Sequence, residues 1–387
     1  MELIKPTAVV IGGVGKLPYA GISLYYLHHV TGLQKLGYEV HYVERQNRRH
    51  ECYDPETNRM TDEPGYALRY LADILPRFGI DNDHYSFIDR ADACFGAGWE
   101  RLRAALDRAE FVLTVADPTW FDELERCSRR LYIDGDPMFT QVAMATGTGT
   151  RAEAATHYDC LFTYAMRIDR PDCTVPTAGR KWFGARPVVD TTFWSVTSGS
   201  RSLPVTGLMH WAAGEDLEFG GRTYGHKNRE FEKFIDLPRR AKGPFRLAVG
   251  GGSAPKGRLQ DLGWNLADPL RETQGIEDYR AFIGGSRADL GVAKHAYVTS
   301  RSGWFSDRST CFLASGRPVL HQDTGCGDWL PVGRGVLLFS DMDSLLEALE
   351  SLDADYEQHA RAARTIAEEY FEASAVLEIM LQAGGLR

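Results

Sequence analysis

The sequence predicts an α/β protein with two doubly wound, Rossmann-like domains in tandem and a helical tail at its C-terminal end. Short apolar runs alternate with amphipathic segments along most of the chain, which is the pattern of parallel strands covered by helices. Most of the apolar runs end in polar or glycine-containing loops, where open α/β sheets carry their ligands. A chain of 387 residues also exceeds what one hydrophobic core usually serves, so more than one domain is expected.

In the first half, a strand is expected at 7–13 and a helix at 22–37, where apolar residues recur at three-residue steps and Gly37 ends the helix. Further elements are a helix at 66–79 and strands at 38–44, 111–118, 129–137 and 160–166. The small polar residues of 192–202 are typical of a linker. We therefore expect the first domain to span residues 1–201.

The second half repeats the alternation, and we expect a second domain at residues 202–353. Its expected strands are 202–211, 245–252, 295–304, 317–325 and 335–341. Helical patterns then cover 342–353 and 354–383. The helices of the tail, residues 354–387, are expected to cross back to the first domain.

Composition limits the class of protein. The formal net charge of −9 argues against nucleic acid as a partner, because a phosphate backbone is bound by a basic face. Seven scattered cysteines without a CxxC pair favour free thiols in a reducing cytoplasm over disulfides or a zinc site. No basic segment followed by an apolar leader and no long apolar run is present, so we expect a cytoplasmic protein without a membrane span. The oligomeric state is not predicted.

The first strand runs into the glycine-rich loop of "VVIGGVGKLPYAGI". A P-loop would need glycine at Val10 and serine or threonine at Leu17, so this motif is excluded. The dinucleotide fingerprint would need its third glycine at Pro18. Glu44 could still take the place of the ribose-binding acid, which leaves a nicotinamide-dependent dehydrogenase as an alternative.

We interpret Gly12, Gly13 and Gly15 as the border of a cleft in which a bulky acceptor lies against the backbone. A tight turn between strand and helix is the alternative. Trp120, at the end of another first-domain strand, is predicted to contact the same acceptor, because tryptophan faces stack on flat molecules. An acceptor of this kind could be a flat natural product.

A short helix is expected to begin near Ser306 in "GWFSDRSTCFLASGRPV". Ser306, Ser309 or Thr310 could cap it, and its free amides would form an anion site. Arg308 adds a planar cation suited to a diphosphate. Asp307 is either an ordinary charge in the first helical turn or part of that site.

The run of helix, "LASGRPVLHQDTG", strand "GVLLF" and "MDSLLEALESL" resembles the donor half of GT-B glycosyltransferases, nearest to their spore-coat-protein-like and bacterial family 1 branch. The specific similarity covers 299–352. "PYAGISLYYLHHVTGLQKLGYEVHYVE" resembles the first strand-helix-strand unit of that group. The resemblance implies transfer of a sugar from a UDP-, dTDP- or GDP-sugar, as co-substrate, to a small-molecule or peptide acceptor. An epimerase of the same fold and a non-catalytic nucleotide-sugar-binding protein are the alternatives.

The resemblance also implies donor-binding residues in the second domain. Cys311 stands where many members carry a ribose-binding glutamate, which moves that role to Asp307, Ser309 or another loop. Lys227 matches the phosphate-binding lysine of the family. The remaining expected donor contacts are Gly251, Gly252, Ser253 and Trp304, together with Ser306, Arg308 and Thr310.

Glycosyl transfer needs a stabilised diphosphate and, with inversion, a base for the proton of the acceptor. Cations and helix N-termini can stabilise the diphosphate, so we expect no metal and no cofactor. Asp134 and Asp136 form a D-x-D pattern that is either a metal motif or a turn. As base we favour Asp136, then Asp117 and Asp134, with His28 on the first helix as a further candidate.

Overall fold

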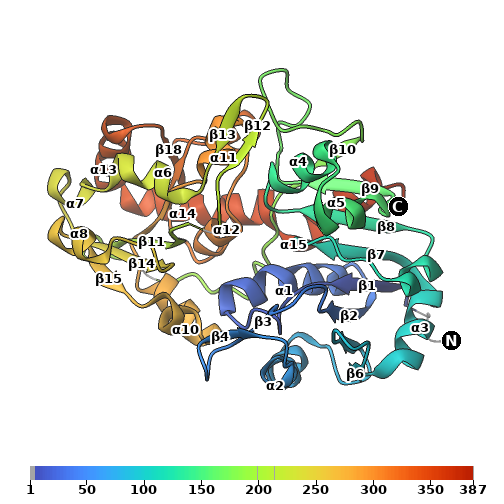
Figure 1. Cartoon of the computed structure of the whole chain (residues 1–387). Coiled ribbons are helices and arrows are strands. Elements are labelled where there is room, and N and C mark those ends of the chain that lie inside the picture. Colours follow the sequence, from blue (N-terminus) through green and yellow to red (C-terminus); the bar gives the residue numbers. More distant parts are fainter. Residues whose placement is uncertain (1–4, 198, 213, 387) are drawn as a thin grey trace.

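The computed structural model describes residues 5–197, 199–212 and 214–386, and it contains one large sheet in each half of the molecule (Figure 1). All neighbouring strands of the first sheet are parallel except β6, which runs antiparallel to β5. From edge to edge this sheet consists of β10 (Trp182–Gly184), β9 (Cys160–Thr163), β8 (Arg130–Asp134), β7 (Ala109–Val115), β1 (Thr7–Ile11), β2 (Glu39–Arg45), β5 (Tyr85–Ile88) and β6 (Cys94–Gly96).

The second sheet is parallel throughout. Its strands are, in order, β15 (Asn265–Ala267), β14 (Phe245–Gly250), β11 (Val205–His210), β16 (Ala288–Gly291), β17 (Val319–Gln322) and β18 (Val336–Phe339). Counted along the chain this is the order 3-2-1-4-5-6 of a doubly wound sheet, and the first sheet has the same order around β1. The strand order therefore reverses between β1 and β7 in one half and between β11 and β16 in the other.

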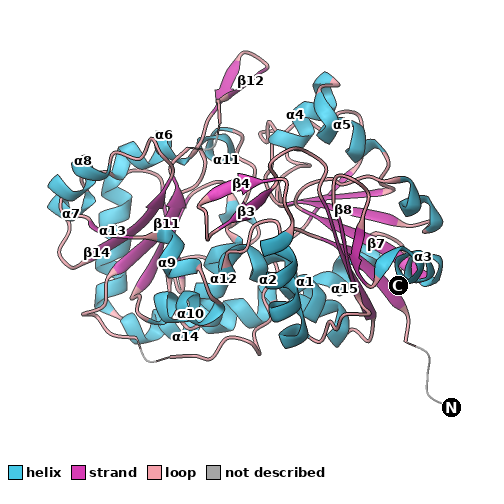
Figure 2. Cartoon of the chain, turned by 60° about the horizontal axis from the view of Figure 1, so that its bottom comes forward, coloured by secondary structure: helices cyan, strands magenta, loops and turns pink. Residues whose placement is uncertain are grey.

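Helices cover both sheets, as the alternating sequence pattern predicts (Figure 2). In the first half they are α1 (Ala20–Lys35), α2 (Gly65–Ile74), α3 (Gly98–Arg108), α4 (Phe139–Thr146) and α5 (Gly149–Thr156). In the second half they are α6 (Lys227–Phe231), α7 (Leu237–Arg240), α8 (Lys256–Asp261), α9 (Pro269–Thr273), α10 (Ile276–Gly284), α11 (His295–Thr299), α12 (Asp307–Ala314) and α13 (Met342–Ala354). Two small hairpins complete these halves, β3 (Cys52–Asp54) with β4 (Arg59–Thr61) and β12 (Leu217–Phe219) with β13 (Arg222–Tyr224).

One predicted strand is wrong. The segment 295–304 begins with the helix α11, and the strand of this unit is β16, four residues upstream of it. A short apolar run does not distinguish a strand from a buried helical turn, because both bury their side chains. The pairing of β16 with β11 and β17 decides the assignment.

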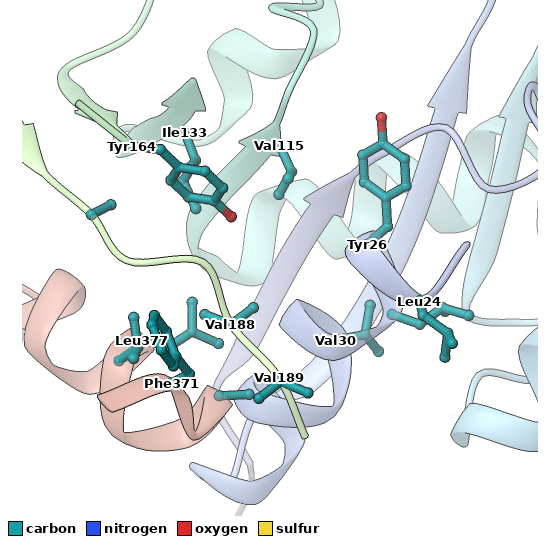
Figure 3. Packing of buried hydrophobic residues seen from close by; sticks show 14 of the residues in the cluster. Leu24, Tyr26, Val30, Val115, Ile133, Tyr164, Val188, Val189, Phe371 and Leu377 are labelled. Carbon is teal, nitrogen blue, oxygen red and sulfur yellow. The ribbon is translucent and has the colours of Figure 1, made fainter. Parts of the chain in front are cut away.

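The chain ends in α14 (Tyr356–Ile366) and α15 (Ala373–Ala383), which lead from the second half to the first (Figure 1). α15 packs against α1 so closely that a Cβ on Gly32 would lie 2.7 Å from Leu377 Cδ1. Phe371 and Leu377 lie beside Val188 and Val189 in the buried cluster of the first half (Figure 3). The tail therefore fastens the two halves together.

The expected linker is also held by packing. Trp194 is buried, and its indole Nε1 donates to His28 Nε2 at 3.2 Å. Arg317, itself buried, donates to the carbonyl oxygen of Thr197. Ser198 of this stretch lies outside the described residues. Within the described ranges, no helix combines the length and the apolar character that crossing a bilayer requires.

Candidate functional site

A hollow of about 410 Å³ opens between the two halves. It lies where the amino end of α1 approaches the carboxyl ends of β11 and β14, beside the point at which the strand order of the second sheet reverses. Ligands of open α/β sheets bind at such points. Its lining consists of Tyr19, Gly21, Ile22 and Tyr25 from the first half, and of Leu208, Met209, His210, Lys227, Gly250, Pro269, Leu270, Thr273, Tyr279, Asp307 and Arg308 from the second.

Lys227 stands at the start of α6 in the wall of this hollow. Its ammonium group makes no hydrogen bond or ion pair with any residue that the structure describes. Burial, followed by the nearby charges of Arg308 and Lys294, lowers the pKa of Lys227 to about 7. A bound anion would stabilise the protonated lysine, so the hollow is suited to a negatively charged ligand.

The amino end of α12 reaches the same hollow, since Asp307 lines it. Ser306 is the residue that caps this helix, but its side chain makes no capping hydrogen bond. The alternative caps are wrong: Thr310 Oγ1 donates to the carbonyl oxygen of Asp307 at 2.6 Å, and Ser309 Oγ donates to Asp289 at 2.6 Å. Burial raises the pKa of the Asp307 carboxyl.

Arg308 lines the hollow as expected, but its guanidinium is bound elsewhere. Nε and Nη2 donate to the two carboxylate oxygens of buried Asp289 at 3.2 and 3.1 Å, and Nη1 donates to the carbonyl oxygen of Leu208 at 2.6 Å. Each nitrogen thus already has a protein partner. Arg308 brings positive charge to the hollow, but it is not the free fork that the sequence predicts.

The other expected donor contacts do not line the hollow. Gly250 lines it in place of Gly251, Gly252 and Ser253. Gly251 has a φ of +101°, and a Cβ there would lie 3.3 Å from His210 Nε2. Trp304 is buried, and its Nε1 donates to the carbonyl oxygen of Gly135 at 3.2 Å, so it joins the two halves.

Asp136 makes a second contact between the halves. Lys294 Nζ lies 2.6 and 2.8 Å from its two carboxylate oxygens, and the Tyr297 hydroxyl also donates to it. The Asp136 side chain is nevertheless 45% exposed. Asp136 therefore bridges the two halves, oriented by two side chains from the region of α11, and it does not line the hollow between them.

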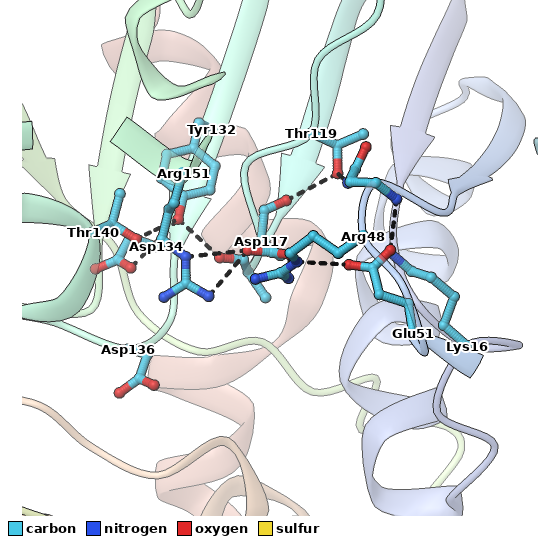
Figure 4. A network of polar contacts seen from close by, with 12 residues as sticks. Lys16, Arg48, Glu51, Asp117, Thr119, Tyr132, Asp134, Asp136, Thr140 and Arg151 are labelled. Atoms are coloured by element: carbon cyan, nitrogen blue, oxygen red, sulfur yellow. Dashed lines mark hydrogen bonds and ion pairs between the residues drawn. The ribbon is translucent and has the colours of Figure 1, made fainter. Parts of the chain in front are cut away.

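The remaining candidate bases differ in environment (Figure 4). Asp134 is buried and accepts hydrogen bonds from Gln141 Nε2 at 2.7 Å and Thr163 Oγ1 at 3.1 Å, and burial raises its pKa to about 6. Asp117 is half-buried and lies between two arginines. His28 is buried as an acceptor for a tryptophan N–H, and burial lowers its pKa to about 3. The structure therefore does not bring His28 to the cleft.

Two residues with unusual backbone flank these carboxylates. Ala116, between β7 and Asp117, has a φ of +71°, and Met138, two residues after Asp136, has a φ of +86°. Such conformations cost about 1–3 kcal/mol each and concentrate at functional sites. Their position at the carboxyl edge of the first sheet marks this edge as a candidate site.

The glycine loop packs tightly against its own domain. A Cβ on Gly12 would lie 2.6 Å from Tyr42 Oη, and one on Gly15 would lie 2.8 Å from Leu71. Glu44 is buried and accepts the amides of Gly15 at 2.7 Å and Lys16 at 3.0 Å. The carboxylate is thus bound by its own loop, which removes the ribose-binding role on which the dehydrogenase alternative depends.

Gly13 and Trp120 lie in the walls of two further hollows of the first half. The Trp120 ring stacks on His157 with centroids 3.9 Å apart and planes at 10°. Arg130 lies over the same ring at 5.6 Å from its centroid. Acceptor contact by these two residues remains a prediction.

Sequence reasoning missed the aromatic residues at the start of α1 and His210 at the end of β11. Tyr19 and Tyr25 follow the glycine loop within "PYAGISLYY", and His210 ends the strand that opens the second half. Their positions, after the loop that follows the first strand and at the end of β11, could have marked them as candidates. No sequence pattern indicates that these two segments face the same hollow.

The chain was compared with known proteins. No protein-family model matches it, and no curated protein matches its sequence. Solved structures do match: an α-glucosyltransferase in complex with UDP has a TM-score of 0.59 at 10% identity, covering 98% of this chain and 100% of its own. HepE of Anabaena in complex with UDP-glucose has a TM-score of 0.55 at 10% identity, covering 97% and 98%.

At these identities the likeness is one of fold, and the fold is that of the GT-B glycosyltransferases: two Rossmann-like domains with a cleft between them. The spore-coat-like branch remains a prediction.

The expectation that nucleic acid is not a partner is wrong for this fold. An α-glucosyltransferase that is 9% identical, with a TM-score of 0.60 and coverage of 98% and 100%, was solved with UDP and a 13-mer DNA containing an HMU base. Net charge sums over the whole surface, whereas a polyanion is held by a local basic face. A charge of −9 therefore does not exclude such a face.

Proposed function

We propose that the protein is a glycosyltransferase that moves a sugar from a nucleoside-diphosphate sugar to an acceptor held by the first half. The hollow between the halves is the observation that carries this proposal. Its wall contains the unpaired ammonium of Lys227, the charge of Arg308 and the amino end of α12. Together these groups suit the diphosphate that leaves when the bond to the sugar breaks.

The solved structures of this fold that hold UDP or UDP-glucose support a uridine nucleotide as the first donor to test. dTDP- and GDP-sugars are the further candidates. The cations stabilise the diphosphate by charge alone, so we propose transfer that requires neither a metal ion nor a cofactor.

In an inverting reaction, we propose Asp136 as the base that takes the proton of the acceptor. Its carboxylate is half exposed at a contact between the two halves, and Lys294 and Tyr297 hold its orientation. Asp117 is the alternative base, since it follows β7 at the carboxyl edge of the first sheet, as Asp136 follows β8. Asp134 is less suited because its carboxylate is buried, whereas that of Asp136 is half exposed.

The test is titration with UDP, followed by incubation with UDP-sugars. Because UDP binds only the folded state, a concentration of 100 times Kd should stabilise the protein by roughly 2.7 kcal/mol. Release of UDP that depends on acceptor supports transfer. Conversion of the donor without acceptor would instead indicate an epimerase, and tight binding without turnover would indicate a binding protein.

A further inference from the structure

The first half carries a basic groove that the proposed donor site does not use. Two adjoining hollows of about 390 and 420 Å³ open near the ends of β1, β2 and β7, and both have Arg48 and Asp117 in their walls. We call the two together the arginine groove. Their cationic lining consists of Lys16, Arg45, Arg48, Arg49, Arg90 and Arg151.

Positive charge exceeds negative charge in this lining. Glu51, Asp117 and Glu153 are the acidic residues of the lining, and Asp92 and Asp62 pair with Arg45 and Arg90 from outside it. Five carboxylates thus face six cations, in a chain whose formal charge is −9. Charged residues usually mix on a surface of this kind. The local excess therefore marks the arginine groove as a place for an anion.

Two of the arginines share one carboxylate (Figure 4). Arg48 Nη2 lies 2.6 Å from Asp117 Oδ2, and Arg151 Nη2 lies 3.1 Å from Asp117 Oδ1. Arg48 Nε also donates to Glu51 Oε1 at 3.0 Å. The two arginine side chains are 49% and 36% exposed, so these ion pairs contribute little to stability. Nη1 of each arginine has no partner among the described residues and is open to a ligand. Guanidinium groups at such spacing suit phosphate oxygens, which they bind through paired hydrogen bonds.

The arginine groove adjoins the donor hollow through α1. Tyr26 lines the groove, and its chain neighbour Tyr25 lines the hollow between the halves. The ring centroids of Tyr25 and Tyr26 lie 5.2 Å apart, so the walls of the groove and of the donor hollow meet at this pair of rings. A molecule held in the groove is thus placed beside the site of transfer.

From this arrangement we infer that the acceptor is a phosphate-bearing molecule, whose phosphate binds Arg48 and Arg151 while its hydroxyl reaches the donor hollow past Tyr26. The inference rests on the proposed function. The hydroxyl oxygen forms the bond to the anomeric carbon, and the bond from that carbon to the diphosphate breaks. The electron pair of the broken bond leaves with the nucleoside diphosphate, and the hydroxyl proton passes to the carboxylate base.

Binding tests the groove independently of catalysis. Inorganic phosphate and a short labelled oligonucleotide, as single strand and as duplex, are titrated with UDP present to fill the donor hollow. The same titrations are repeated on Lys227→Met, whose donor hollow lacks its free cation. The groove variant is Arg48→Gln/Arg151→Gln, and the matched control is Arg103→Gln/Arg126→Gln, which removes two exposed, ion-paired arginines outside the groove.

We expect the groove variant to weaken binding by roughly tenfold or more per arginine, and the control to bind as the wild type does. Binding of phosphate without the oligonucleotide supports a small phosphomonoester as acceptor. Binding of the oligonucleotide that falls steeply with salt supports a phosphodiester polymer.

The inference is overturned if neither probe binds the wild type, or if the groove variant binds both unchanged. It is also overturned if Lys227→Met, and not the groove variant, abolishes binding, because the anion would then occupy the donor hollow. If the groove binds phosphate while UDP neither binds nor is released from a UDP-sugar, the anion site stands and the proposed glycosyl transfer fails.

Discussion

Replacing Lys227 by methionine tests the donor site most directly. The substitution keeps the length of the side chain and removes a cation of the lining that has no hydrogen bond or ion pair among the described residues. A hydrogen bond to a charged group contributes about 1.5–3 kcal/mol, so the Kd for UDP should rise by roughly 10- to 150-fold. Isothermal titration calorimetry at pH 7 measures this change.

The pH dependence gives a second, independent number. Burial lowers the pKa of Lys227 to about 7 in the unliganded protein, and the proposed binding of UDP should favour the protonated form. Affinity should therefore fall as pH rises above 7, by about fivefold between pH 7 and pH 8, until the contribution of the charge is exhausted. Lys227→Met should show no such dependence between pH 7 and 9, where the charge of UDP is nearly constant.

The same pKa makes a prediction for stability. In the unfolded chain the lysine keeps its proton up to pH 10.5, whereas the folded protein loses it near pH 7. The unfolded state binds more protons between these values, so Lys227 makes the free energy of unfolding rise with pH in that window.

Lys242→Met is the control for the affinity and the stability measurements, because Lys242 is exposed before β14, at the end of the sheet opposite the hollow. Equal UDP affinity in wild type and Lys227→Met would refute the assignment.

Three further predictions follow from the contacts described above. Asp136→Asn should lower kcat by roughly 10²–10⁴ with unchanged UDP affinity, since a general base contributes that much; an unchanged kcat would exclude it as the base. Arg308→Met should lower the free energy of unfolding in urea by about 3–5 kcal/mol because it leaves buried Asp289 without its ion-pair partner. Adding Asp289→Leu should recover most of this loss. Gly12→Ala should cost about 1–3 kcal/mol by crowding two tyrosines, whereas Gly252→Ala, which meets nothing within 4 Å, should leave Tm unchanged.

Local patterns in the sequence were sufficient for the fold. The alternation of apolar strands and amphipathic helices predicts both sheets, and the resemblance of the region after 299 to donor halves agrees with the GT-B architecture. Lys227, Asp307 and Arg308 were predicted near the donor, and all three line the hollow between the halves. Their contact with a donor stays a prediction. The fold could be predicted because periodicity and short motifs are properties of neighbours along the chain.

Contacts between distant segments were beyond such patterns. The sequence predicts a free Arg308 guanidinium because no residue near it in the chain indicates its ion pair with Asp289. Asp289 lies on β16, and Arg308 lies on α12. The sequence leaves Glu44 open as a ribose ligand, whereas in the structure its carboxylate accepts hydrogen bonds from the amides of the glycine loop. A short apolar run was taken for a strand because only pairing with a neighbouring strand distinguishes the two.

The amino-acid sequence by itself determined the class of fold and the alternation of strands and helices that builds both sheets. Only the tertiary structure decided which cations are already paired and which remain open to a ligand, and it alone gathered the arginines of the first half into one groove. The physical reason is that side-chain pairing and burial depend on the distance between atoms in space, and residues such as Arg48 and Arg151 lie a hundred positions apart in the chain yet share one carboxylate.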